Sequence, residues 1–68
     1  MAISIFLNGE PHTAREGQTI LDLLSALQID PQRVAIELDR RILKQPNWAA
    51  TELRDGAQLE IVQFVGGG

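Results

Sequence analysis

The chain has 68 residues, which is enough for one small domain with a single core. It has no cysteine, which excludes disulfide bonds and thiolate metal sites, and its net charge of −3 argues against nucleic acid or an anionic membrane as the main partner. The sequence shows neither an apolar run of about 18 residues nor the pattern of a signal peptide, so we expect a soluble protein of the reducing cytoplasm.

The N-terminal residues predict a β-hairpin. Apolar residues occupy every second position from 3 to 7, which is the period-two pattern of a strand with one face on a core. Asn8-Gly9 follows, and both residues tolerate the positive φ angles of a two-residue turn. A return strand over 11–14 is expected at a sheet edge, because Pro11 lacks the N–H group that a central strand needs.

An amphipathic helix is expected next. Thr19 can cap it, and Asp22 completes a capping-box pattern and places negative charge near the helix N-terminus. Apolar residues then recur with i, i+3, i+4, i+7 spacing at Ile20, Leu23, Leu24 and Leu27. Asp30-Pro31 is expected to end this helix of roughly ten residues, which is too short to be stable alone and needs a sheet to lie on.

The middle of the chain predicts a second pair of strands. The alternation over 34–38 indicates a half-buried strand, Asp39-Arg40-Arg41 a turn, and 42–44 a short partner strand. Over 46–50 a single helical turn is expected, with Trp48 as its anchor. Trp48 is either a core residue or a recognition residue, and in a small domain an aromatic side chain is more often core.

The last strand is expected from about 58 to 65, after a turn at Asp55-Gly56. These elements predict an α+β roll, in which a mixed sheet of four to five strands carries one main helix across one face. The first and last strands would pair in parallel at the sheet centre. That position explains why the last strand carries apolar residues on both faces.

One helix can cover only one face of this sheet. The residues expected to face it are Ile3, Ile5, Leu7, Leu59 and Ile61. Phe6, Val62 and Phe64 then point the other way, where they form either an exposed docking patch or a minor second core under the loops.

The C-terminal residues carry the one group that is positioned for chemistry. We expect a domain over 1–65 that ends in a flexible tail over 66–68, because glycines can pass through a narrow channel and carry the Gly68 carboxylate into a partner's active site. A carboxylate is a poor acyl donor and is most naturally activated as an acyl adenylate. The sequence offers no metal cluster, phosphate-binding loop or catalytic triad, and His12, the only histidine, is expected to be solvated. The chain is therefore expected to be no enzyme and to hold no cofactor, and another protein would activate it.

Several segments form a pattern that extends nearly from end to end. They are Phe6-Leu7-Asn8-Gly9-Glu10, Gly17-Gln18-Thr19-Ile20-Leu21-Asp22-Leu23-Leu24, Val34-Ala35-Ile36-Glu37-Leu38, Trp48-Ala49, Leu53-Arg54-Asp55-Gly56 and Ile61-Val62-Gln63-Phe64-Val65-Gly66-Gly67-Gly68. By these segments the chain resembles the sulfur carrier protein family of thiamine biosynthesis, which belongs to the ubiquitin-like β-grasp group. A terminal Gly-Gly alone is weakly specific, and its combination with this length and the Trp48 segment is more telling.

The resemblance implies a β-grasp fold and a role as a protein co-substrate. A ubiquitin-activating-type enzyme would adenylate Gly68 with ATP, and a persulfide donor such as a cysteine desulfurase would convert it to a thiocarboxylate. Thiazole synthase would take that sulfur to build the thiazole ring. By the resemblance, Gly66 and Gly67 would thread the active sites, with Phe64 and Val65 at the base of the tail. Together with the face described above, the residues expected to contact partners are Phe6, Val62, Phe64, Val65, Gly66 and Gly67.

Two positions depart from the family's pattern. Asp39-Arg40-Arg41 stands where such proteins often have an Asn-Gly-type turn, and Ala57 follows Asp55-Gly56 where an acidic residue is common. Both are turn positions, so the departures concern local geometry only.

Other functions stay open at this point. The alternatives are a sulfur carrier for molybdopterin synthesis, whose family members are usually longer, a ubiquitin-like protein modifier, and a plain interaction module. In each case we expect the free protein to be a monomer.

Overall fold

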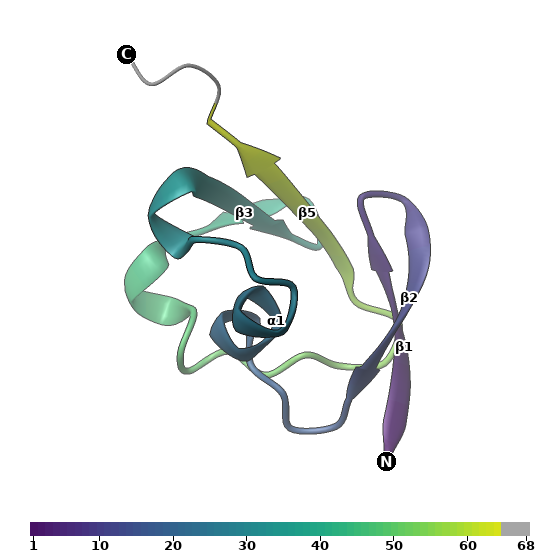
Figure 1. The fold of residues 1–68 in the computed structure, drawn as a ribbon. Helices are drawn as coiled ribbons and strands as arrows, with labels where there is room; N and C mark the ends of the chain where they lie inside the picture. The colour runs from purple at the N-terminus through teal and green to yellow at the C-terminus, as the bar shows by residue number, and fades with distance from the viewer. Residues whose placement is uncertain (65–68) are drawn as a thin grey trace.

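A five-stranded mixed sheet with an α-helix on one face makes up the computed structural model, which describes residues 1–64 (Figure 1). The strands are β1 (Ala2–Leu7), β2 (Glu10–Arg15), β3 (Val34–Leu38), β4 (Arg41–Leu43) and β5 (Gln58–Gln63). Their order in the sheet is β2-β1-β5-β3-β4. β1 and β5 pair in parallel at the centre, while the other neighbours are antiparallel. The predicted α+β class and the central parallel pair are confirmed.

The β1–β2 hairpin forms as predicted. Asn8 and Gly9 have φ angles of 51° and 83°, the positive values that a tight two-residue turn requires. The return strand is longer than expected and spans Glu10–Arg15. Pro11 lies opposite Phe6 on this edge strand. Its missing N–H group therefore removes no hydrogen bond from the central strands of the sheet.

The main helix, α1 (Ile20–Ala26), begins as predicted. The Thr19 side chain accepts a hydrogen bond from the Asp22 N–H at 3.1 Å, and the Asp22 carboxylate accepts one from the Thr19 N–H at 3.1 Å. This reciprocal pair is a capping box, which satisfies two N–H groups that the helix leaves free.

The predicted end of α1 is wrong. The helix stops at Ala26, because Gln28 adopts a positive φ of 59° and the Ile29 N–H turns back to the Leu24 carbonyl at 2.9 Å. This geometry is a C-terminal capping motif in which glycine is usual, and glutamine gives no such signal in the sequence.

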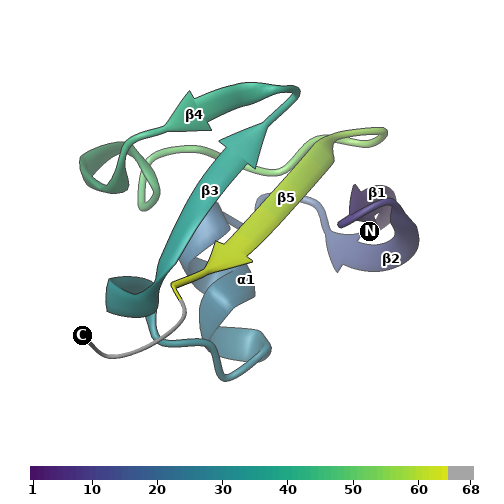
Figure 2. The same ribbon diagram turned by 90° about the horizontal axis from the view of Figure 1, so that it is seen from above.

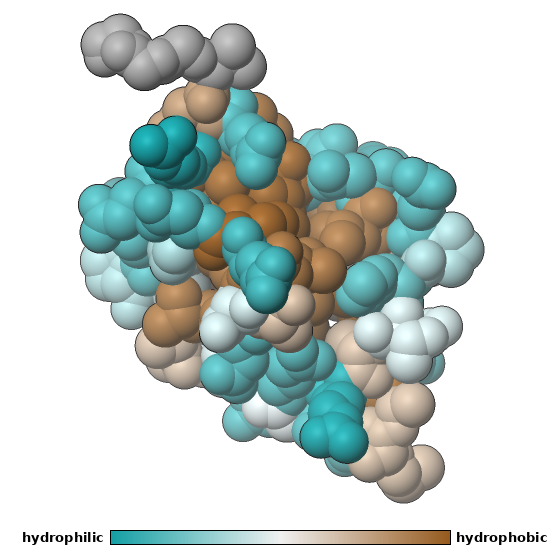
Figure 3. Space-filling view, in the orientation of Figure 1, coloured by the Kyte–Doolittle hydropathy of each residue, from teal (hydrophilic) through white to brown (hydrophobic). Residues whose placement is uncertain are grey.

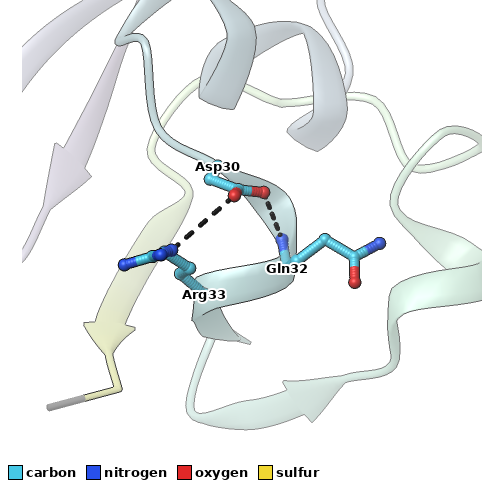
Figure 4. A network of polar contacts seen from close by, with 3 residues as sticks. All are labelled: Asp30, Gln32 and Arg33. Carbon is cyan, nitrogen blue, oxygen red and sulfur yellow. Dashed lines mark hydrogen bonds and ion pairs between the residues drawn. The ribbon is translucent and has the colours of Figure 1, made fainter. Parts of the chain in front are cut away.

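Asp30 begins a separate 3-10 helix, η1 (Pro31–Arg33), rather than ending α1. Its carboxylate accepts a hydrogen bond from the Gln32 N–H at 2.9 Å and lies 3.8 Å from the Arg33 Nε (Figure 4). The ion pair is mostly solvent-exposed, so it contributes little to stability compared with the capping hydrogen bond.

The turn between β3 and β4 is shorter than predicted. It consists of Asp39 and Arg40, with φ angles of 50° and 71°, and Arg41 already belongs to β4. This is the two-residue geometry that an Asn-Gly pair favours, here formed by two residues with side chains.

The core lies between α1 and one face of the sheet. Its fully buried side chains are Ile5, Ile20, Leu23, Leu24, Ile36 and Leu59. Ile3, Leu7 and Ile61 are partly buried against this cluster, as expected for residues on the helix side. Figure 2 shows α1 passing behind β3 and β5, so that within residues 1–64 no helix lies over the opposite face of these strands.

Trp48 belongs to the core. Its side chain is 3% exposed, and its Nε1–H donates a hydrogen bond to the Leu43 carbonyl at 2.8 Å. It follows a second 3-10 helix, η2 (Gln45–Asn47), which is the expected helical turn. A recognition role for this tryptophan is therefore excluded by its burial.

Candidate functional site

The last described residue, Phe64, lies directly after β5, the central strand. Val65, Gly66, Gly67 and Gly68 lie outside the described residues 1–64, and the roles predicted for them stay predictions. What the structure does describe is how the strand that precedes them is held. β5 has β1 on one side and β3 on the other (Figure 2).

The side chain of Asn8 forms hydrogen bonds with β5 beyond the point where β1 ends. β1 and β5 are paired only at Phe6–Gln58 and Leu7–Leu59, after which β1 turns away into the hairpin. Beyond that point, the Asn8 Oδ1 accepts a hydrogen bond from the Ile61 N–H at 2.8 Å, and its Nδ2 donates to the Ile61 carbonyl at 3.3 Å. One amide side chain therefore occupies both backbone groups of Ile61 as a neighbouring strand would.

The start of β5 is held by Asp39, from the β3–β4 turn. The Asp39 N–H donates to the Gln58 carbonyl at 2.7 Å, and the Gln58 N–H donates to the Asp39 carboxylate at 3.0 Å. Asp39 has a φ of 50°, and in this conformation both its N–H group and its carboxylate contact the backbone of Gln58. From the sequence, Asn8 and Asp39 are predicted only as turn residues, because their contacts with β5 cross 53 and 19 residues of the chain.

The end of β5 is held from one side. β3 pairs with it as far as Val34–Gln63, and the Phe64 N–H donates to the Arg33 carbonyl of η1 at 2.9 Å. On the other side, within residues 1–64, a hollow is lined by Leu7, Asn8, Leu27, Ile29, Ile61 and Gln63. Figure 3 shows the band of apolar surface that runs beside β5 toward α1.

The uncovered face of the sheet carries the three apolar side chains expected there. Phe6, Val62 and Phe64 are 42%, 51% and 64% exposed, so they form no second core. Ile42 on β4 is also strongly exposed, and the sequence analysis did not place it on this face. Its place follows from its register opposite Glu37, which could be assigned only once β3 and β4 were aligned. Whether this surface binds a partner stays a prediction.

Chemical groups in the rest of the described chain are few. Residues 1–64 hold no group of three metal-binding side chains and no buried charged side chain. His12 lies opposite Ile5 on β2 and is partly buried rather than fully solvated. Among these same residues, no helix is long and apolar enough to cross a bilayer.

Comparison with known proteins gives a consistent result. The model of the ThiS family matches residues 5–68. The chain is 39% identical over 66 residues to a thiazole synthase of Magnetococcus marinus and covers 97% of its own length there. It spans only 20% of that relative's length. It is also 40% identical over 50 residues to the sulfur carrier protein ThiS of Bacillus subtilis, covering 74% of this chain and 76% of that one.

The fold has a close match among solved structures. The crystal structure of the thiamine biosynthesis protein ThiS from Geobacter metallireducens has a TM-score of 0.84 and 33% sequence identity. The match covers 97% of this chain and 100% of the other. The β-grasp fold implied by the sequence is thereby confirmed.

Proposed function

The chain belongs to the ThiS family of sulfur carriers in thiamine biosynthesis, and from this membership we propose that Gly68 carries the sulfur as a thiocarboxylate for the thiazole ring. The observation that supports this most directly is the family match, which runs to residue 68 and so includes the three terminal glycines.

The proposed chemistry needs two steps at the Gly68 carboxyl group. In the first, a carboxylate oxygen attacks the α-phosphate of ATP and displaces pyrophosphate, which gives an acyl adenylate. In the second, the terminal sulfur of a donor persulfide attacks the carbonyl carbon and displaces AMP. A thiol then reduces the resulting S–S bond, which leaves the thiocarboxylate. Adenylation is needed because it replaces oxide with AMP as the leaving group.

These steps require partner proteins. We propose a ubiquitin-activating-type enzyme that binds the ATP, a cysteine desulfurase or other persulfide donor, and thiazole synthase as the acceptor. Thiazole synthase is supported by two curated relatives of that name, each of which contains a region similar to 97% of this chain. In those relatives the region similar to this chain and the rest of the protein share one polypeptide. The chain itself acts as a co-substrate rather than an enzyme.

The proposed docking surface is the uncovered face around Phe6, Val62 and Phe64. Exposed apolar side chains grouped on one face of a small domain are typical of protein contacts. Val62 lies on β5 and Phe64 directly follows it, so a partner that binds them also fixes the position from which the chain continues to Gly68.

Intact mass tests the proposal. The protein is incubated with ATP, the adenylating enzyme, a cysteine desulfurase and cysteine, and a gain of about 16 Da is expected as oxygen is replaced by sulfur. A variant lacking Gly68, or one extended by a residue, should show no gain and should unfold at nearly the same temperature. Sulfur incorporation in either variant would refute the role of Gly68, and a ladder of protein conjugates would indicate a modifier instead.

A further inference from the structure

Two carboxylates face each other in the middle of the uncovered sheet face. Glu37 on β3 is directly opposite Glu60 on β5 in the antiparallel register. Their neighbours on these strands, Ile36, Leu38, Leu59 and Ile61, pack on the helix side, so both glutamates point away from it. Directly opposite residues have Cβ atoms about 4.5–5.5 Å apart, and like charges at this distance destabilise a sheet.

Apolar side chains surround this pair. Ile42 lies opposite Glu37 on the other side of β3, and Val62 is the next outward residue after Glu60. Phe6 lines the same hollow of about 380 Å³ as the two glutamates. Phe6, Ile42 and Val62 are all exposed, so apolar side chains flank the carboxylates, while Arg40 lines the same hollow.

Neither carboxylate has a cationic partner within the described residues 1–64. Arg40 lines the hollow beside them, yet the ion pair found in this part of the chain is the one between Asp30 and Arg33. No hydrogen bond to either carboxylate forms in the same part of the chain. Within residues 1–64, the repulsion between Glu37 and Glu60 is therefore offset by no ion pair or hydrogen bond, and Arg40 is the one cationic side chain that lines their hollow.

A partner that covers the apolar residues must also cover the glutamates. Burying two carboxylates is costly unless each is paired with a cation and hydrogen-bonded. A planar guanidinium with five N–H donors can bridge two carboxylates, and it is more weakly hydrated than an ammonium group. Arginine is accordingly enriched among the residues that dominate binding at protein interfaces.

We propose that an arginine of thiazole synthase inserts its guanidinium between Glu37 and Glu60 when that enzyme docks on the uncovered face. The inference rests on the proposed function and adds a charged contact to its apolar surface. It assigns the pair a role in binding, since like charges that lie directly opposite each other in a sheet do not favour folding.

Calorimetric titration with thiazole synthase tests this contact. The Glu37→Gln/Glu60→Gln variant should bind about thirtyfold more weakly than the natural chain at about 0.1 M NaCl. The difference should shrink at about 1 M NaCl, where screening is stronger. Its unfolding temperature should rise by about 2–5 °C as the repulsion is removed. Weaker binding by a more stable domain is a combination that a purely structural role would not produce.

A matched control is Glu10→Gln/Glu16→Gln, which changes the net charge by the same amount on β2 and the turn after it. This control should bind like the natural chain. Equal affinity of the two double variants would overturn the inference while leaving the proposed function intact. Absence of binding by the natural chain would instead overturn both.

The nature of the cation is tested separately. Guanidinium chloride at about 0.1 M should weaken binding of the natural chain more than NaCl does at equal ionic strength, and it should have no such extra effect on Glu37→Gln/Glu60→Gln. An equal effect of the two salts would overturn the assignment to arginine. Loss of binding on addition of EDTA would overturn it too, because a bridging metal ion would then be required.

Discussion

Replacing Asn8 should release one side of the strand that leads to the C-terminus. The Asn8 side chain makes two hydrogen bonds to the backbone of Ile61, at 2.8 and 3.3 Å, and its own φ is 51°. Each hydrogen bond contributes about 0.5–1.5 kcal/mol, and a positive φ costs a residue such as alanine about 1–2 kcal/mol. Asn8→Ala should therefore lower the free energy of unfolding by about 2–5 kcal/mol, a large share for a domain of this size.

The variant Asn8→Gly separates the two effects. Glycine accepts the positive φ without strain, so the loss of stability of Asn8→Gly should reflect the two hydrogen bonds and amount to about 1–3 kcal/mol. Urea unfolding of both variants measures the two free energies. The difference between the variants then gives the cost of the backbone conformation alone.

Amide hydrogen exchange supplies the local measurement. The Ile61 N–H should lose protection in both variants, since its acceptor is the Asn8 side chain. The Phe6 N–H, which donates to the Ala57 carbonyl at 2.8 Å, should remain protected and serves as the reference. Unchanged exchange at Ile61, together with unchanged stability of Asn8→Gly, would refute the idea that Asn8 replaces a strand beside β5.

Three further substitutions have definite expected outcomes. Arg40→Gly should raise the unfolding temperature by about 2–8 °C, because Arg40 has a φ of 71°, and a decrease would show that its side chain makes a stabilising contact. Trp48→Phe should cost about 1–3 kcal/mol, since it leaves the Leu43 carbonyl without its donor, and circular dichroism should follow the unfolding because Trp48 is the only tryptophan. Phe64→Asp should change stability by less than about 0.5 kcal/mol yet weaken binding to the adenylating enzyme about tenfold, whereas an unfolded variant would show that Phe64 is part of the core.

The sequence correctly predicted the turns and helix starts that are determined by the residues forming them. Asn8-Gly9 and the Thr19–Asp22 pair each specify a backbone geometry by their own chemistry, and both form as predicted. The errors fall where residues without a strong preference adopt a positive φ. Gln28 ends α1 and Arg40 tightens the β3–β4 turn, although neither is glycine or asparagine. Neither glutamine nor arginine favours a positive φ by its own chemistry, so the sequence around them gives no signal for these conformations.

The sequence could predict only those parts of the candidate site that follow from the alternation of side chains along a single strand. Parity along the strands placed Phe6, Val62 and Phe64 on the uncovered face. It could not show that Glu37 and Glu60 are direct neighbours, because that fact depends on the register between β3 and β5. Each glutamate taken alone is typical of a solvated strand residue, and their significance arises from the pairing.

The position of the proposed docking surface at β5 limits where a partner can perform its chemistry. The Phe64 N–H is bonded to the Arg33 carbonyl, so the backbone at residue 64 is fixed to the domain. Four residues separate Phe64 from the end of the chain, and at about 3.3–3.6 Å per residue they span at most about 14 Å. A partner that binds Phe6, Val62 and Phe64 must therefore place its reacting atom within about 14 Å of the docked Phe64. A complex in which the nearest active site lies farther away would rule out this face as the one used during sulfur transfer.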